Sequence, residues 1–438
     1  MPKPKLITLY EHEYTENFNW SEKDLLAVSK MNAEIGANVL SPVVRFGKRE
    51  FKGSEQVGVV KFGNRSVQIL PKIYRPNYSG NEEQIAREAS RNLLKLLSYA
   101  GNFPFNESEM NSLLKQTNDW FEILIHLFAT RLHGEWCKGA YRNYQVTRDE
   151  IPVLKGKWLI SEQLKDPIRR TVFTVEYDEF SSDNPLNRIL RFVVEKLFLF
   201  TSNARNKQTL SELRASLSEV TLLKQITKED ISAIKLTRIN ARFAPLLNLA
   251  KMFLENSSIQ LSHGATETFS FVFDMNLLFE NFIAEFIRRN KSAILEEALI
   301  NCNIFQQGLG GNSLHLARSE ERDYFKLKPD IVFRSTDGNF PLILDTKYKS
   351  LKREQGNLGI SNDDFYQMHA YAHRYKSPRI VLLYPQTIEM SAPVRKTFRL
   401  HSGDINVKIA TVNMQIDLNK HADRIALVNE LKEILGAN

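Results

Sequence analysis

Cysteine is scarce in this sequence of 438 residues, which contains only Cys137 and Cys302. Two cysteines so far apart are too few for a disulfide framework or a zinc cluster. The sequence therefore excludes the small disulfide-stabilised and zinc-bound classes of protein. We expect a protein of the reducing cytoplasm.

Long apolar runs are absent as well. The most apolar run, residues 192–200, is interrupted by Glu195 and Lys196. Residues 1–14 have no apolar core of the length that a signal peptide needs. We therefore expect neither a signal peptide nor a membrane-spanning helix, and no membrane partner.

The phosphate-binding loop of nucleotide hydrolases is missing from the sequence. No Gly-x-x-x-x-Gly-Lys-Ser/Thr motif occurs, and residues 308–311, Gly-Leu-Gly-Gly, are not followed by a lysine. We expect no nucleotide hydrolysis by this chain. Low-complexity linkers and internal repeats are also absent, so the whole length is available for two or three globular domains.

The periodicity of apolar residues predicts an α/β fold class of the multidomain α+β kind. We place a β-rich domain at 1–105, a mainly helical region at 106–262 and a third domain at 263–438. A boundary at 256–264 separates the last two. The individual expectations are strands at 56–60 and 66–70 around Gly63-Asn64, helices at 111–132, 187–200 and 243–255, a β insertion at 153–175, and a closing helix at 418–435.

Positive charge is in excess, with a formal net charge of +8. This balance favours a polyanionic partner, and double-stranded DNA is the partner that we expect. Basic residues are often only solvated surface, but two clusters adjoin the acids discussed below: Lys347, Lys349, Lys352 and Arg353, and Arg288, Arg289 and Lys291.

A predicted hairpin brings two of these acids together. Apolar residues at 331–333 and 341–344 read as strands, and Asp337-Gly338 between them is typical of a two-residue type I′ turn. That register sets Asp330 opposite Asp345, with Cβ atoms about 5 Å apart. Two carboxylates at this separation repel unless one is protonated or a cation lies between them. The pair therefore predicts a site for Mg²⁺ or Mn²⁺.

Lys347 joins this site because it follows Asp345 by two residues, the period of a strand. Two metal-binding carboxylates with an ammonium group suit phosphodiester hydrolysis, in which the lysine orients a water or offsets negative charge. The alternative is a solvated hairpin with surface charges, because an apolar run that ends in Asp-x-Lys is also an ordinary strand end.

Two helices flank the hairpin in sequence. Gln367 and Tyr371 are four residues apart in the second, so both side chains could reach one phosphate, or they could simply be part of amphipathic packing. Glu280 lies in the first, within a helix that starts near Phe273 and ends near Asn290. It is either a solvated helix glutamate or a further acid at the metal site.

These elements together resemble the PD-(D/E)xK nuclease superfamily, with Glu280 on a helix, Pro329-Asp330 and Asp345-Thr346-Lys347 on a hairpin, and Gln367-x-x-x-Tyr371 as in the RecB-type branch. The rest of the chain narrows the resemblance to the McrC family, the nuclease subunits of McrBC modification-dependent restriction systems. The segments that carry this likeness are 57–59, 69–73, 93–100, 138–144, 154–157, 178–180 and 183–188. Lys155 and Lys157 depart from the arginines common there.

The resemblance implies a restriction-endonuclease-like C-terminal core that cuts DNA. It implies Asp330, Asp345 and the backbone carbonyl of Thr346 as metal ligands, with Lys347 positioning water. Its further catalytic residues would be Glu280, Gln367 and Tyr371. It also implies a separate McrB-like AAA+ GTPase oligomer that recognises modified DNA, with the N-terminal domain as its natural contact.

Two other functions remain open at this stage. One is a stand-alone PD-(D/E)xK nuclease of DNA repair or processing, which would cut without a motor. The other is a non-catalytic scaffold that binds DNA or a partner. Two facing carboxylates argue against the scaffold, because a surface that only binds DNA has no use for them.

Overall fold

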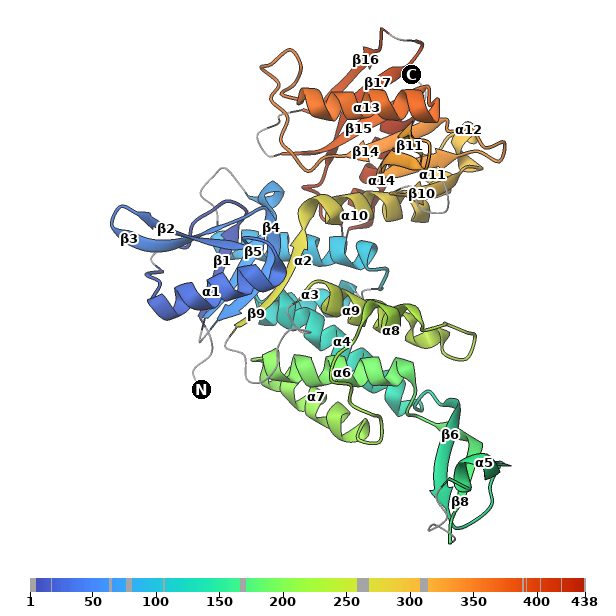
Figure 1. The fold of residues 1–438 in the computed structure, drawn as a ribbon. Helices are drawn as coiled ribbons and strands as arrows, with labels where there is room; N and C mark the ends of the chain where they lie inside the picture. Colours follow the sequence, from blue (N-terminus) through green and yellow to red (C-terminus); the bar gives the residue numbers. More distant parts are fainter. Residues whose placement is uncertain are drawn as a thin grey trace. The chain divides into compact units, whose positions relative to one another are not determined.

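The chain folds into two compact units (Figure 1). The computed structural model describes residues 5–16, 18–62, 65–75, 81–104, 107–165, 171–257, 268–307, 314–387, 390, 392–401, 403–418 and 420–436. We call residues 121–269 the helical unit, and residues 5–120 with 270–438 the sheet unit. In sequence, the helical unit is thus inserted into the sheet unit. The three domains at 1–105, 106–262 and 263–438 stay a prediction.

The N-terminal part of the sheet unit contains a four-stranded sheet in the order β1-β5-β4-β9. Its strands are β1 (Lys5–Tyr10), β4 (Gln56–Phe62), β5 (Arg65–Leu70) and β9 (Thr268–Asp274). β1 runs parallel to β5, and β4 runs antiparallel to it. The strands predicted at 56–60 and 66–70 are confirmed, whereas Gly63-Asn64 lies outside the described residues.

A helix and a β-ribbon in this region were not predicted from the sequence. The helix α1 (Glu22–Ile35) begins with a capping box between Ser21 and Asp24 and buries Val28 and Met31. The ribbon consists of β2 (Leu40–Arg45) and β3 (Lys48–Gly53). Both pack on a core that includes Phe18, Phe51 and Phe62.

The remaining elements of the sheet unit are mostly C-terminal. They are η1 (Lys72–Tyr74), α2 (Glu82–Ala100), α3 (Glu107–Gln116), α10 (Met275–Arg289), α11 (Lys291–Ile294), α12 (Glu297–Ile300), β10 (Asn303–Gln306), β11 (His315–Arg318), β12 (Asp323–Lys326), β13 (Ile331–Arg334), β14 (Leu342–Thr346), α13 (Asn362–Tyr375), β15 (Arg379–Gln386), β16 (Arg395–Arg399), β17 (Asn406–Asn413) and α14 (His421–Leu435). The helix predicted at 418–435 is confirmed as α14.

A six-stranded sheet organises this C-terminal part, in the order β10-β13-β14-β15-β17-β16. β14 and β15 are parallel, so the chain must cross over between them, and α13 makes this crossover. Met368, Tyr371 and Tyr375 of α13 pack with strand residues such as Ile343 and Leu382 in one buried core. Figure 1 shows α13 lying across the sheet. This packing fixes the orientation of α13, so that Gln367 lies beside Lys347 at the end of β14.

The helical unit contains α4 (Trp120–Cys137), β6 (Asn143–Ile151), β7 (Lys157–Trp158), α5 (Ile160–Gln163), β8 (Phe173–Ser181), α6 (Pro185–Phe200), α7 (Ala204–Ser216), α8 (Lys228–Ser232), η2 (Ala241–Phe243) and α9 (Ala244–Glu255). The helices predicted at 187–200 and 243–255 are confirmed. The helix predicted at 111–132 is wrong as one element, because α3 ends at Gln116 and α4 starts anew. A β insertion is present, but the predicted bounds of 153–175 are wrong: β6 lies wholly before residue 153, and its partner β8 continues to Ser181.

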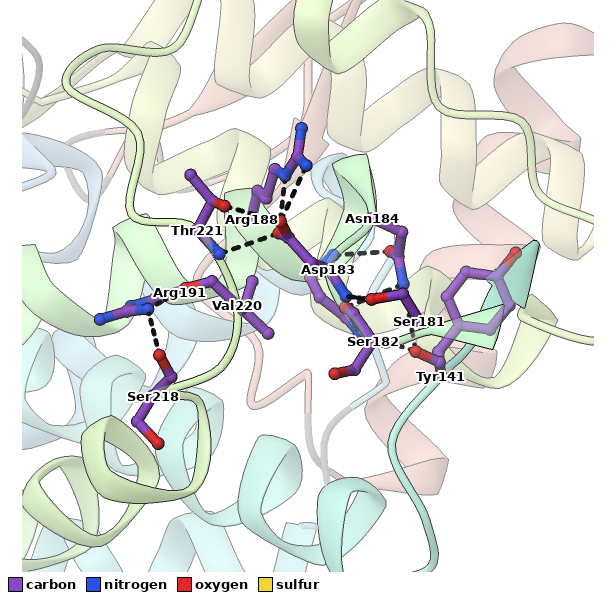
Figure 2. A network of polar contacts seen from close by, with 11 residues as sticks. Tyr141, Ser181, Ser182, Asp183, Asn184, Arg188, Arg191, Ser218, Val220 and Thr221 are labelled. Carbon is purple, nitrogen blue, oxygen red and sulfur yellow. Dashed lines mark hydrogen bonds and ion pairs between the residues drawn. The ribbon is translucent and has the colours of Figure 1, made fainter. Parts of the chain in front are cut away.

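A polar network fastens the base of this three-stranded insertion to helix α6 (Figure 2). Asn184 caps α6 by accepting from the backbone of Asn187, and both amides donate to the carbonyl of Tyr141 next to β6. Asp183 accepts two hydrogen bonds from Arg188, 2.7 and 2.9 Å long, and two from Thr221. The pKa of Asp183 falls to about 2, chiefly because Arg188 donates to it. The Asp-Asn-Pro-x-Asn-Arg stretch thus has a structural role.

Among the helices that the structure describes, none is long and apolar enough to cross a lipid bilayer.

Candidate functional site

The hairpin of β13 and β14 has the register that the sequence predicts. Ile331 pairs with Leu344, and the next position outward sets Asp330 against Asp345. The predicted two-residue turn at Asp337-Gly338 is wrong. The amide of Gly338 donates to Ser335, Gly338 has a φ of 84°, and Ser335 pairs with Asn339, so the loop has one residue more than the predicted turn. The loop between the strands is therefore longer than predicted, but the strand register keeps Asp330 opposite Asp345.

Asp330 is held by the strand opposite it. Its Oδ2 accepts two hydrogen bonds of 2.7 Å from Thr346, one from the backbone amide and one from the hydroxyl. Burial raises the pKa of Asp330, while the two bonds from Thr346 act in the opposite direction. The side chain of Thr346 thus fixes this carboxylate, a role that sequence reasoning did not assign to it.

Buried Asp345 at the end of β14 forms an ion pair with the half-buried Lys347 that follows the strand. Asp345 is 0% exposed, and Nζ of Lys347 lies 2.6 Å from its Oδ1. The same ammonium group donates to Oε1 of Gln367 over 3.1 Å, and the Gln367 amide donates to the hydroxyl of Tyr371 over 2.7 Å. Four predicted residues from β14 and α13 therefore form one continuous polar chain.

Glu280 lies in α10, and its carboxyl group is influenced by the charges of Asp330, Asp345 and Lys347. It is 6% exposed, and its Oε2 accepts a hydrogen bond of 3.2 Å from Gln307. Its pKa rises to about 8, chiefly because the carboxyl is buried and also because of the negative charges of Asp330 and Asp345. The solvated-glutamate interpretation does not hold for this residue. Gln307 was missed from the sequence, because its place follows from β10 pairing with β13 rather than from any local pattern.

Burial and the neighbouring charges also shift the pKa values of Asp345 and Lys347. The pKa of Asp345 rises to about 7 because the carboxyl is buried and faces Asp330, although Lys347 opposes the shift. Burial acts to lower the pKa of Lys347, but the charges of Asp345 and Asp330 outweigh it and the pKa is raised. The site thus holds one charged cation among carboxyl groups that keep their protons to a higher pH than usual.

A divalent cation fits this set of donors. Oδ2 of Asp345 and Oε1 of Glu280 are buried and have no hydrogen-bond partner among the described residues. Within the same part of the chain, no three His, Cys, Asp or Glu side chains form a ready-made metal cluster. Mg²⁺ commonly takes one or two carboxylates and keeps several waters, so Asp330, Asp345 and a backbone carbonyl suit it better than they suit zinc.

The basic clusters near the site make contacts within the chain. Arg288 and Arg289 both pair with Glu285, and Lys291 donates to the carbonyl of Cys302. Lys349 pairs with Asp364. DNA contact by these clusters stays a prediction.

Comparison with known proteins decides the family. The family model described as "McrBC 5-methylcytosine restriction system component" matches residues 51–385, which include all the site residues above. The chain belongs to this McrBC family.

Two solved structures are similar to this McrBC family member. One is the refined half-complex from a tetradecameric assembly of Thermococcus gammatolerans McrB AAA+ hexamers with bound McrC, at 23% identity and a TM-score of 0.65, covering 98% of this chain and 100% of that one. The other is the cryo-EM structure of the Thermococcus gammatolerans McrBC complex, at 25% identity and a TM-score of 0.48, covering 66% and 88%. The first shows that the fold is shared. No curated protein matches the chain.

One more contact in this McrBC family member ties the N-terminal strands to the site. Glu11, which follows β1, accepts hydrogen bonds of 2.8 Å from the amide of Lys72 and from the hydroxyl of Tyr348, the neighbour of Lys347. Glu11 is 4% exposed and its pKa rises to about 7, mainly through burial. No sequence pattern links residues so far apart.

Proposed function

We propose that this chain is the metal-dependent endonuclease subunit of a McrBC-type restriction complex, built on a PD-(D/E)xK core. It hydrolyses phosphodiester bonds of DNA when it is coupled to an AAA+ GTPase or ATPase, stimulates that partner, and defends the cell against foreign, modified DNA. The observation that carries this proposal is the ion pair of buried Asp345 with Lys347, 2.6 Å long, together with Asp330 opposite Asp345 on the hairpin and Glu280 close enough for the charges of both aspartates to raise its pKa.

The metal in this proposal is Mg²⁺, or Mn²⁺ in its place. Asp330, Asp345 and the backbone carbonyl of Thr346 would hold it, with Glu280 as an additional acid. When bound, such an ion polarises a phosphate oxygen and lowers the pKa of a bound water. The buried, unpartnered oxygens of Asp345 and Glu280 support this assignment.

Lys347 acts on the attacking water and on the phosphate. Its ammonium group can donate hydrogen bonds that orient a water, and its charge offsets the negative charge that grows on the phosphate in the transition state. Gln367 accepts a hydrogen bond from this ammonium group and donates one to the hydroxyl of Tyr371. These two residues of α13 therefore orient the side chain of Lys347. Because Lys347 stays protonated, it serves as a donor and not as a general base.

The partner in this proposal is a separate AAA+ motor. The Thermococcus gammatolerans complex of McrB AAA+ hexamers with bound McrC supports this assignment, since it shares the fold over nearly the whole chain. The sequence has no phosphate-binding loop of its own. The net charge of +8 supports duplex DNA as the substrate.

The test is Mg²⁺-dependent cleavage of methylated and unmethylated plasmid, with and without the candidate motor and GTP or ATP. Asp345→Asn removes one carboxylate of the site, and we expect a loss of cleavage of at least about 100-fold with the fold retained. The matched control is Asp337→Asn, an exposed acid on the turn of the same hairpin, which should cut like the unmodified chain.

The outcomes separate the candidate functions. Cleavage that needs the motor, the nucleotide and Asp345 supports the proposal. Cleavage without the motor indicates a stand-alone nuclease. Absence of cleavage under every condition indicates a binding scaffold, and equal cleavage by Asp345→Asn contradicts the proposed site.

A further inference from the structure

The ribbon of β2 and β3 ends in an unusual turn. Arg45 pairs with Lys48, so Phe46 and Gly47 alone form the loop, and both have left-handed backbones with φ of 48° and 74°. Such turns favour asparagine and glycine, and a bulky residue there is strained by about 1 kcal/mol or more. Phe46 is also 92% exposed. The protein thus holds an aromatic ring out in solvent at a position that disfavours it.

The ribbon that carries this ring is rich in cations, and the guanidinium of Arg45 lies 5.6 Å from the centre of the Phe46 ring. Arg45, Lys48, Arg49 and Lys52 all lie on the ribbon, whereas its one acid, Glu50, is 4% exposed and pairs with Arg45. The guanidinium of Arg45 lies 4.2 Å from the centre of the Tyr14 ring, and that of Arg49 lies 5.2 Å from the centre of the Trp20 ring. Stacking on a ring holds a guanidinium in place and leaves N–H groups at its edge for an anion.

The base of the ribbon is anchored in the protein core. Phe51 is fully buried against Phe18 and Phe62, and its amide donates to the hydroxyl of Thr15 over 2.8 Å. The indole of Trp20 donates to the carbonyl of Glu50 over 3.0 Å. The tip therefore projects from a fixed base, and Figure 1 shows the ribbon at the margin of the sheet unit's N-terminal part.

We propose that the β2–β3 ribbon is a contact site for duplex DNA, separate from the carboxylate site. Arg45, Lys48 and Arg49 bind backbone phosphates, and Phe46 inserts as an apolar wedge against a base step. Phosphate contacts first fix the position of the protein on the duplex. An exposed apolar side chain can then insert between two base pairs and partly unstack them. The excess of cations favours a polyanion over a protein surface, and the inference rests on the proposed function for its DNA partner.

The test measures binding of a fluorescent duplex by the full chain, alone and with the AAA+ partner, as a function of salt. Phe46→Asn suits the turn better than phenylalanine, so it should retain or raise the melting temperature while affinity falls about tenfold. Arg49→Gln should also weaken binding and reduce the slope of log K against log salt by about 1, whereas Phe46→Asn should leave that slope unchanged.

Phe325→Ala is the matched control, because Phe325 is also 72% exposed with a φ of 57° but lies among both acids and bases on β12. It should bind like the unmodified chain. If the ribbon variants bind normally, or lose only stimulation of the motor, the ribbon is not a DNA contact. If the unmodified chain binds no duplex under either condition, both this inference and the DNA substrate of the proposed function fail.

Discussion

Glu11 shows how burial of one carboxyl can govern stability. Its carboxylate receives the Lys72 amide and the Tyr348 hydroxyl, yet burial dominates and raises its pKa from 4.5 to about 7. Because the folded state binds this proton more tightly than the unfolded state, the contribution of Glu11 to stability is present below about pH 4.5. It is lost as pH rises through about 7.

We predict that Glu11→Gln, which cannot ionise but still accepts both bonds, stabilises the protein at alkaline pH. The expected gain in the free energy of unfolding is on the order of 2 kcal/mol above pH 7 and vanishes towards about pH 5. Urea unfolding at the two pH values measures it. Glu321→Gln, at an exposed position, is the control for loss of charge. A gain that does not depend on pH would contradict the prediction.

Sequence reasoning reached the residues of the site where a single element carries them. The strand period placed Lys347 beside Asp345, and the helix period placed Gln367 near Tyr371, because both depend on local geometry alone. Gln307 and Glu11 could not be found in this way. Their partners, Glu280 in α10 and Tyr348 after β14, lie on segments that only tertiary packing brings close to them.

At the scale of elements, the short distance between strands β4 and β9 requires a glycine at position 58. A Cβ on Gly58 would lie 2.2 Å from the carbonyl oxygen of Phe271 and 2.6 Å from Cα of Val272. Both neighbours are backbone atoms, which cannot rotate away as a flexible side chain could. The strands must separate if this position carries any side chain.

Gly58→Ala is therefore expected to destabilise the chain by about 1–3 kcal/mol or more, since overpacking distorts the sheet. A fall in the urea midpoint or melting temperature would show it. Gly134→Ala is the matched control, because a Cβ there meets nothing within 4 Å and alanine favours the helix α4. The same change should thus act in opposite directions at the two glycines.

Elements were predicted best where amphipathic patterns and turn residues agree, as for β4, β5, α13 and α14. The helix α1 was missed although Ser21 and Asp24 form a capping box, because the surrounding strands suggested a continuous β region. The β insertion extends further than predicted since β6 and β8 are stabilised by pairing with each other and carry many polar residues. Strands that are stabilised mainly by pairing with each other are difficult to predict from local composition.

At the scale of the whole molecule, the charge of +8 determines how the chain should respond to salt. Cations that bind phosphates release counterions, so affinity for DNA falls as salt rises. We predict at least a tenfold loss of duplex affinity between about 50 and 200 mM salt. Fluorescence anisotropy of a labelled duplex measures this. Affinity that is flat over the range would mean that the positive charge does not contact DNA.

The insertion of one unit into the sequence of the other has a consequence during synthesis. β4 ends at Phe62, but β9, its neighbour in the sheet, begins at Thr268. At ribosomal speeds of about 5–20 residues per second, these strands leave the ribosome roughly 10–40 s apart. Throughout that interval the edge of β4 is exposed on the nascent chain, where it can pair with other unfinished polypeptides. A chain that ends before β9 would keep this edge of β4 open.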